Sequence, residues 1–203
     1  MTKSMMPLAF AASLLLGAAA HAQTPTAPAA VQAGAYAVEP GHTQVGFTVN
    51  HMGFTEYSGV FSKASGDLSL DPKTLAATKL DITVPIETVA TTSTVLDGEL
   101  RGDKWLDGAK YPTMSFRSTK ITRTGADTAE VAGQLTLHGV TQPVVLKARF
   151  LGAGVNPLDK SYTVGFQVTG DIKRSDFGVK TYVPLIGDEV HLHIAAAFTK
   201  KAS

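Results

Sequence analysis

Apolar and polar residues alternate along most of this chain from Tyr36 onward, with the period of two that is typical of β-strands. The clearest example starts at Val131, and a second alternating run extends from Val144 to Phe150. A turn is predicted between the two runs, over Gly139 to Pro143, because Gly and Pro favour turns. The two runs therefore predict a long antiparallel hairpin with one apolar face and one polar face.

The same alternation recurs in four further runs, at residues 45–49, 80–86, 162–173 and 190–199. The stretch from Tyr57 to Leu70 changes parity, because Phe61 falls on an odd position and Leu68 on an even one. Such a change requires an extra residue, so we predict a bulge or bend near residues 64–66. About eight strands are expected, which predicts an all-β protein folded as one antiparallel barrel.

Residues 92–107 break this period. Leu96 and Leu100 lie four residues apart, and Thr94 to Asp97 have the spacing of a capping box. Gly102 then interrupts the pattern. A short broken helix near residues 93–107 is predicted, inserted after three strands and before five more, as a plug or lid over one end of the barrel.

The first residues predict export. Lys3 precedes an apolar run, and Ala20 to Ala22 provide the small residues that a signal peptidase recognises. We expect a signal peptide over residues 1–22 that is cleaved after Ala22, with a retained N-terminal anchor as the alternative. No other segment has the roughly 20 apolar residues of a membrane span, so no stable membrane anchor is expected. Residues 23–35, rich in Ala and Pro, are predicted to be a flexible leader ahead of a domain at residues 36–203.

Composition narrows the function further. The chain contains no cysteine, which excludes disulfides and a cysteine-linked lipid anchor. It carries 18 basic and 17 acidic residues, without a basic run, so nucleic acid is not an expected partner. A chain of this length buries a core as one domain.

His191 and His193 stand two apart on the last predicted strand, so their imidazoles project side by side from its polar face. Two such rings could bind a metal ion, but no cysteine and no clear third ligand accompany them. A solvated polar face is the favoured interpretation. No metal site and no cofactor are predicted.

Several other polar residues could meet a ligand head group. His42 and His51 flank the first strand, although a histidine at a turn or strand end more often makes a backbone hydrogen bond. Arg174 and Asp176 could also orient a head group, but an internal ion pair or a turn cap at the strand end is the favoured interpretation. The chain has no Gly-x-Ser-x-Gly elbow, no His-Glu-x-x-His and no phosphate loop, so an enzyme is not expected.

Several motifs, in order, resemble the YceI-like family over residues 36–198. They are YxVxPGHT at 36–43, VxFxVxH at 45–51, GxF at 59–61, LRxxxWLDxxxYPxMxF at 100–116, GxLTLxGVTxPV at 133–144 and IKRSDFG at 172–178. The resemblance implies a lipocalin-like barrel in the periplasm that holds a polyisoprenoid chain, such as a quinone or polyprenyl tail, as a carrier or buffer. Glu39, Thr43 and Lys173 depart from the usual Asp, Ser and Asn of the family.

The inward-facing residues are the expected ligand contacts. They are Phe47, Val49, Phe61, Ile82, Val84, Leu96, Leu100, Trp105, Phe116, Leu135, Phe150, Phe166, Val168 and Ile194. Alternation alone does not distinguish a lumen that holds a lipid from a core in which these residues pack together. The alternative hypothesis is therefore a non-catalytic periplasmic stress or interaction protein with a filled barrel. A homodimer is compatible with either hypothesis.

Overall fold

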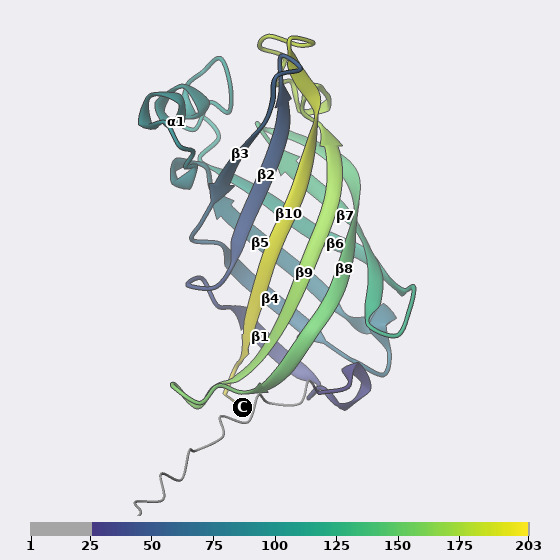
Figure 1. Ribbon diagram of the computed structural model, residues 1–203. Helices are drawn as coiled ribbons and strands as arrows, with labels where there is room; N and C mark the ends of the chain where they lie inside the picture. Colours follow the sequence, from purple (N-terminus) through teal and green to yellow (C-terminus); the bar gives the residue numbers. More distant parts are fainter. Residues whose placement is uncertain (1–25, 203) are drawn as a thin grey trace, which may run out of the picture.

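The computed structural model describes residues 26–202, in which one antiparallel sheet of ten strands curls into a barrel (Figure 1). The expected signal peptide and its cleavage point lie outside the described residues. The strands are β1 (Gly34–Val38), β2 (Gln44–His51), β3 (Thr55–Phe61), β4 (Ser65–Leu70), β5 (Lys79–Pro85), β6 (Thr113–Arg123), β7 (Thr128–Leu137), β8 (Val140–Val155), β9 (Tyr162–Lys173) and β10 (Ile186–Lys200).

The connections between strands contain short helices. They are η1 (Pro28–Ala30), η2 (Leu75–Ala77), η3 (Ile86–Thr88), α1 (Thr94–Arg101) and η4 (Arg174–Phe177), of which only α1 is an α-helix. Within residues 26–202, none of these helices has the length and apolar character needed to cross a membrane.

Eight strand positions close the barrel, because two of them are each divided into two strands. β1 and β2 lie along the same edge of β10: Tyr36 pairs with Lys200 near the end of β10, and Val49 pairs with Val190 near its start. β4 pairs with β1, and β3 pairs with β2, in the same way. The remaining strands follow in order from β4 through β5 to β10, which returns to β1. The expected eight-stranded antiparallel barrel is confirmed.

The division between β3 and β4 is the bend predicted near residues 64–66. Lys63 adopts a φ of 55° and Gly66 a φ of 134°, both outside the strand region. A Cβ atom on Gly66 would lie 2.0 Å from the carbonyl oxygen of Asp81 on the neighbouring β5. Only glycine allows the two backbones to approach this closely while the chain bends.

The hairpin of β7 and β8 forms as predicted, but its turn is shorter. The turn consists of His138 and Gly139, which have φ values of 52° and 74° as a type I′ turn requires. Val140 already pairs with Leu137, and Pro143 lies within β8. The prediction of a turn over residues 139–143 is wrong because a two-residue turn matches the twist of the strands without further residues.

Part of the expected flexible leader, residues 23–35, is folded where the structure describes it. Pro28–Ala30 form η1, and β1 begins at Gly34, two residues before the expected start of the domain. The side chain of Val31 is only 6% exposed, because it packs into the lower end of the barrel. The expectation of a flexible segment is wrong for these residues, since composition does not reveal a single buried anchor.

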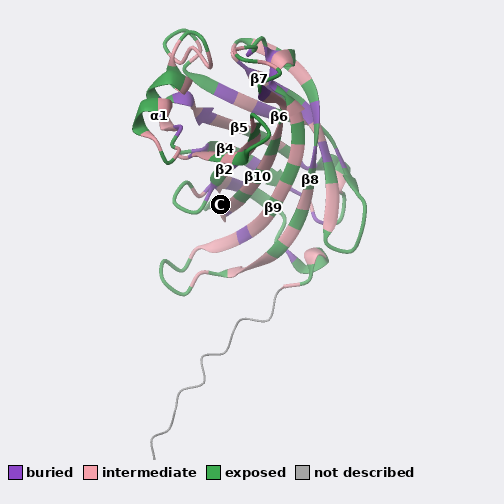
Figure 2. Ribbon diagram, turned by 45° about the horizontal axis from the view of Figure 1, so that its top comes forward, coloured by how far each residue is buried: buried purple, intermediate pink, exposed green. Residues whose placement is uncertain are grey.

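The predicted helix near residues 93–107 forms only in its first half, as α1. Its N-cap is Ser93, whose hydroxyl accepts the N–H of Leu96, rather than the predicted Thr94. Gly102 ends the helix, and the chain continues in turns up to Tyr111. α1 lies to the left of β3 in Figure 1 and at the edge of the barrel in Figure 2, so the helix itself is not the expected lid.

Candidate functional site

Two adjoining cavities occupy the interior of the barrel, with volumes of about 220 and 140 Å³. The larger is lined by Trp105 and Arg174, and it is here called the upper cavity because the loop between β9 and β10, which contains Arg174, lies at the top of Figure 1. The smaller, the lower cavity, reaches Val31 and Phe150. Five residues line both cavities, namely Leu80, Leu146, Val168, Ala196 and Phe198. The two cavities are therefore neighbouring parts of one lumen.

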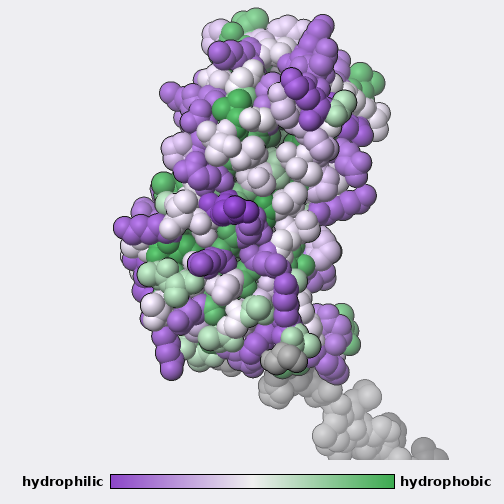
Figure 3. Space-filling model, turned by 180° about the vertical axis from the view of Figure 1, so that it is seen from behind, coloured by the Kyte–Doolittle hydropathy of each residue, from purple (hydrophilic) through white to green (hydrophobic). Residues whose placement is uncertain are grey.

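The walls of the upper cavity are apolar because the inward positions of the strands hold Val, Leu, Ile and Phe. Thr43, Ser115 and Arg174 are the lining residues with hydroxyl or charged side chains. The hydroxyl of Thr43 already donates to the carbonyl of Ala197 and accepts its N–H. The outer surface is different: Figure 3 shows one long face on which hydrophobic residues form small groups among hydrophilic ones.

Inward-facing side chains of β10 show that the lumen is not filled. Val190, Leu192 and Ile194 point inward, yet each is half-buried rather than buried, while the residues between them are exposed on the outer face. In a filled core such positions are fully covered by neighbours. Here the opposite wall lies across a cavity, which leaves part of each side chain uncovered.

Thirteen of the fourteen predicted ligand contacts line these cavities. In the upper cavity they are Phe47, Val49, Phe61, Ile82, Val84, Leu100, Trp105, Phe116, Leu135, Val168 and Ile194. Phe150 and Phe166 line the lower cavity, which Val168 also reaches. Leu96 lines neither, because α1 stands beside the barrel and only Leu100 in its last turn and the residues after it reach the cavity.

The lining also includes residues that the sequence analysis did not select. Examples are Val31, Leu75, Met114, Ile121, Leu146, Leu192 and Phe198. Leu146, Leu192 and Phe198 continue the alternation of their strands, so the pattern contained the signal. Met114 and Ile121 lie on β6, where the register shifts between Ser118 and Lys120 and hides the period of two. Val31 and Leu75 lie outside the strands, where alternation gives no signal.

Arg174 is the charged residue in the wall of the upper cavity. Its side chain donates to three backbone carbonyl oxygens, those of Val179, Ile186 and Gly187, at 2.8 to 3.0 Å. Its guanidinium lies 5.3 Å from the centre of the Trp105 ring. Burial lowers the pKa of Arg174, which still remains a cation at any physiological pH. Neither predicted role, an ion pair or a turn cap, describes it fully, because it holds together the loop between β9 and β10.

Asp188 anchors the same loop from outside the cavity. Its carboxylate accepts the N–H and the hydroxyl of Ser175 at 2.9 and 2.7 Å. Burial by itself would raise the pKa of Asp188, but the hydrogen bonds from Ser175 and the nearby charge of Arg174 lower it overall. These contacts tie the start of η4 to the first residues of β10, which keeps Arg174 in place.

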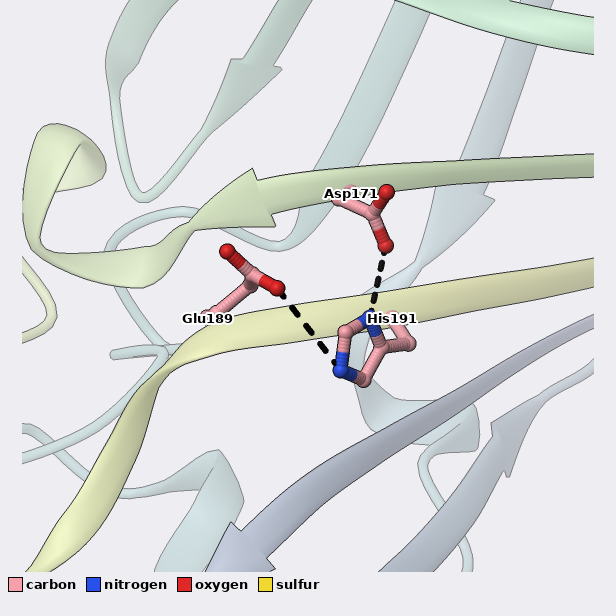
Figure 4. Close-up of side chains that lie close together, drawn as sticks. All are labelled: Asp171, Glu189 and His191. Carbon is pink, nitrogen blue, oxygen red and sulfur yellow. Dashed lines mark hydrogen bonds and ion pairs between the residues drawn. The ribbon is translucent and has the colours of Figure 1, made fainter.

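His191 lies between two carboxylates on the outer face of the barrel (Figure 4). Its Nδ1 is 2.6 Å from Asp171 on β9, and its Nε2 is 3.8 Å from Glu189 on β10. The hydrogen bond to Asp171 is the main cause of a raised pKa for His191. All three side chains are exposed, and His193 is not a member of this group. The two ring nitrogens face different carboxylates, an arrangement that stabilises a protonated imidazole.

The other histidines considered for a head group do not line the lumen. The backbone N–H of His42 donates to the Glu39 carboxylate, and its ring contacts the same carboxylate in an exposed turn. His51 lies at the end of β2, with its ring 6.2 Å from that of Tyr57. Among the acidic residues around α1, Asp97 is buried and accepts the N–H and hydroxyl of Thr91, so its role is structural.

The fold and the lumen together define the class of this protein: a closed antiparallel β-barrel with a hollow apolar interior, as in lipocalin-like proteins. Residues 36–198 match the YceI-like domain. The chain therefore belongs to the YceI-like family, as its motifs indicated.

Two relatives are similar in sequence to this chain over most of their own length. A UPF0312 protein of Vibrio cholerae serotype O1 is 32% identical over 169 residues, covering 82% of this chain and 89% of the relative. Protein YceI of Escherichia coli O6:H1 is 37% identical over 154 residues, covering 76% of this chain and 80% of the relative.

Solved structures show the same barrel. The YCEI protein of Campylobacter jejuni has 30% sequence identity and a TM-score of 0.67, with 75% of this chain and 90% of that chain covered. A structure described as a polyisoprenoid binding domain from Saccharophagus degradans has a TM-score of 0.64 with 82% of this chain and 98% of that chain covered. Its sequence identity is 16%, so the likeness to it is one of fold.

Proposed function

We propose that the protein binds one polyisoprenoid chain inside the barrel and acts as its carrier or buffer. The main support is the hollow lumen. At about 24 cal/mol per Å³, a cavity of 220 Å³ costs on the order of 5 kcal/mol relative to a filled core. That cost is comparable with the whole net stability of a typical domain. An apolar ligand that occupies the lumen offsets it.

The shape and chemistry of the lumen favour a slender hydrocarbon chain. Enclosing such a chain removes its apolar surface from water, at roughly 25 cal/mol per Å², without any polar anchor. The upper and lower cavities adjoin through residues such as Val168 and Phe198, which suits an elongated ligand better than a compact one. The polyisoprenoid binding described for the structurally similar Saccharophagus degradans domain supports the ligand class.

Arg174 is the residue proposed to meet the polar end of the ligand. A guanidinium has five N–H donors, and three hydrogen bonds to backbone carbonyls leave two of them for an oxygen acceptor. Arg174 and Trp105 both border the upper cavity, so a quinone or phosphate oxygen at this end would lie beside a fixed cation. The tail would then extend toward the lower cavity.

Binding rather than catalysis is proposed because the upper cavity lacks paired acid and base groups. Among its lining residues within the described chain, Arg174 is the one with a charged side chain. The expected signal peptide supports a location in the periplasm, where an insoluble lipid needs shielding from water. The alternative of a stress-related or interaction protein with a filled core is disfavoured by the cavity volume.

Mass spectrometry of the native protein tests this proposal. The protein is purified from periplasm without detergent, and its organic extract is expected to contain an isoprenoid in near-stoichiometric amount. Trp105, the single tryptophan, lines the upper cavity and serves as a second reporter, because farnesol added to the delipidated protein should change its emission. An extract without isoprenoid, together with unchanged Trp105 emission in a folded protein, would rule out the function.

A further inference from the structure

Two loops at the upper end of the barrel carry large apolar side chains that are exposed. Phe54 is 84% exposed and Met52 is 48% exposed in the turn between β2 and β3. Tyr182 and Leu185 are each 63% exposed in the segment between η4 and β10. Both loops lie at the same end of the molecule (Figure 1). We call these four residues the apical patch.

The apical patch is connected to the wall of the lumen. The N–H of Met52 donates to the carbonyl of Leu185 at 3.0 Å, which joins the two loops. The ring of Tyr182 lies 6.3 Å from that of Trp105, and Trp105 lines the upper cavity. The exposed apolar surface therefore continues, through one pair of rings, into the surface proposed to contact the ligand.

The backbone geometry of the two loops does not require apolar side chains at these positions. Met52 and Tyr182 have φ values of 57° and 59°, in the left-handed region that favours Gly, Asn and Asp. Apolar side chains are therefore present where small polar residues would fold at least as well. Exposed apolar side chains gathered in one place mark an interaction surface more often than isolated ones do.

The charges around the apical patch fit a lipid surface. Lys180 is the one charged residue in the segments at residues 52–55 and 179–186. The nearest carboxylates in sequence, Glu56 and Asp188, are hydrogen-bonded to Asn50 and Ser175. Lys104 is close to them, because its carbonyl accepts the hydroxyl of Thr181. Within residues 26–202, neither lysine forms an ion pair. Lysine side chains beside exposed aromatic and aliphatic residues are typical of surfaces that bind anionic membranes.

We propose that the apical patch docks on a membrane leaflet that contains anionic lipid, and that the ligand enters or leaves the upper cavity there. Phe54 and Leu185 would insert among the acyl chains, while Lys104 and Lys180 meet the head groups. This inference rests on the proposed function, since an insoluble isoprenoid chain must be loaded from, or delivered to, a membrane.

Flotation with vesicles of phosphatidylethanolamine and phosphatidylglycerol tests the docking. Wild-type protein is expected to float with the vesicles. The double substitution Phe54→Ser with Leu185→Ser should lower the partition coefficient about tenfold or more. Leu158→Ser is the matched control, because Leu158 is 90% exposed in the β8–β9 turn at the opposite end. The control should stay within about twofold of wild type.

The response of Trp105 to farnesol separates this proposal from the proposed function. The double variant should keep the wild-type response, because it leaves the lumen unchanged. Wild-type protein that does not float, or an equal loss in the Leu158 control, overturns the docking proposal. A change in oligomeric state of the double variant, seen by sedimentation without vesicles, also overturns it, because the patch would then cover a second copy. A wild-type protein whose Trp105 does not respond to farnesol contradicts the proposed function, whatever the flotation shows.

Discussion

Arg174 is a cation in the wall of an apolar cavity, and backbone carbonyls rather than a carboxylate hold it there. This arrangement makes it both a structural residue and a donor toward the lumen. A buried charge without a paired carboxylate is tolerated because each hydrogen bond to a charged donor is stronger than one between neutral groups.

Replacement of Arg174 tests its structural role. Arg174→Met leaves three carbonyls without their donor and should lower the free energy of unfolding by about 3 kcal/mol. Urea denaturation followed by far-UV circular dichroism measures the loss. Arg149→Met is the control, because Arg149 is exposed and its side chain donates to that of Gln167, and its effect should stay near 0.5 kcal/mol. Equal effects of the two substitutions would contradict this role of Arg174.

His191 predicts a pH dependence on the outer face. Its pKa in the folded protein is raised, mainly by the hydrogen bond to Asp171, so the folded state binds the proton more tightly than the unfolded state does. The stabilisation is complete below the ordinary histidine pKa of about 6.5 and is lost as the pH rises through the folded value. An NMR titration should show the pKa of His191 falling toward the ordinary value in Asp171→Asn.

Thermal unfolding gives the matching stability measurement. The difference in Tm between wild type and Asp171→Asn should be largest in mildly acidic buffer and should disappear in alkaline buffer. The effect is small, because the pair is exposed to solvent. A difference in Tm that grows with pH would have the wrong sign and would show that His191 is not the group responsible.

At the scale of elements, the divided strand β3–β4 depends on Gly66. Gly66→Ala should cost about 2 kcal/mol or more, because a Cβ atom would collide with the carbonyl of Asp81 and φ is 134°. Gly152→Ala on β8 is the control, since a Cβ atom there has no neighbour within 4 Å. Thermal unfolding of both variants measures the difference, and a stable Gly66→Ala protein would show that the bend tolerates a side chain.

Most strands were predictable because each has one apolar face toward the lumen and one polar face toward solvent, so apolar residues recur with a period of two in the sequence. β6 was counted among the five strands expected after the helix, but its alternation was not described, since its register shift between Ser118 and Lys120 moves the apolar residues from even to odd positions. The short turn at residues 138–139 was misplaced because Pro143, a residue rare inside strands, suggested a longer turn. Composition did not indicate the helix η1 or the burial of Val31, because one buried side chain in an Ala- and Pro-rich segment produces no periodic pattern.

At the scale of the whole molecule, alternation identified the residues of the lumen but not the space between them. Phe47 and Val168 point inward in either a filled or a hollow barrel, and only the positions of opposite walls decide which one forms. The charged wall residue Arg174 was considered for a head group, yet its carbonyl partners come from a loop whose path is set by the tertiary fold.

Filling the lumen should abolish binding without unfolding the protein. Ala196 lines both cavities, so Ala196→Phe would place an aromatic ring where the two adjoin. The isoprenoid recovered from purified protein should fall about tenfold or more, as measured by mass spectrometry of the organic extract. Ala195→Phe is the matched control, because Ala195 is the next residue on β10 and is exposed on the outer face. Equal recovery from the two variants would place the ligand outside the lumen.

The pairing of β1 with β10 joins the start of the folded domain to its end. On the edge of β1 that faces away from β4, Tyr36, Ala37 and Val38 pair with residues 198–200 of β10. During synthesis, the sheet therefore stays open at this seam until residues 198–200 are available for pairing. A chain that ends a few residues early would keep two unpaired strand edges, and such edges associate with other chains. Closure of the barrel thus depends on its last strand, and chains whose seam is still open can pair with one another through these edges.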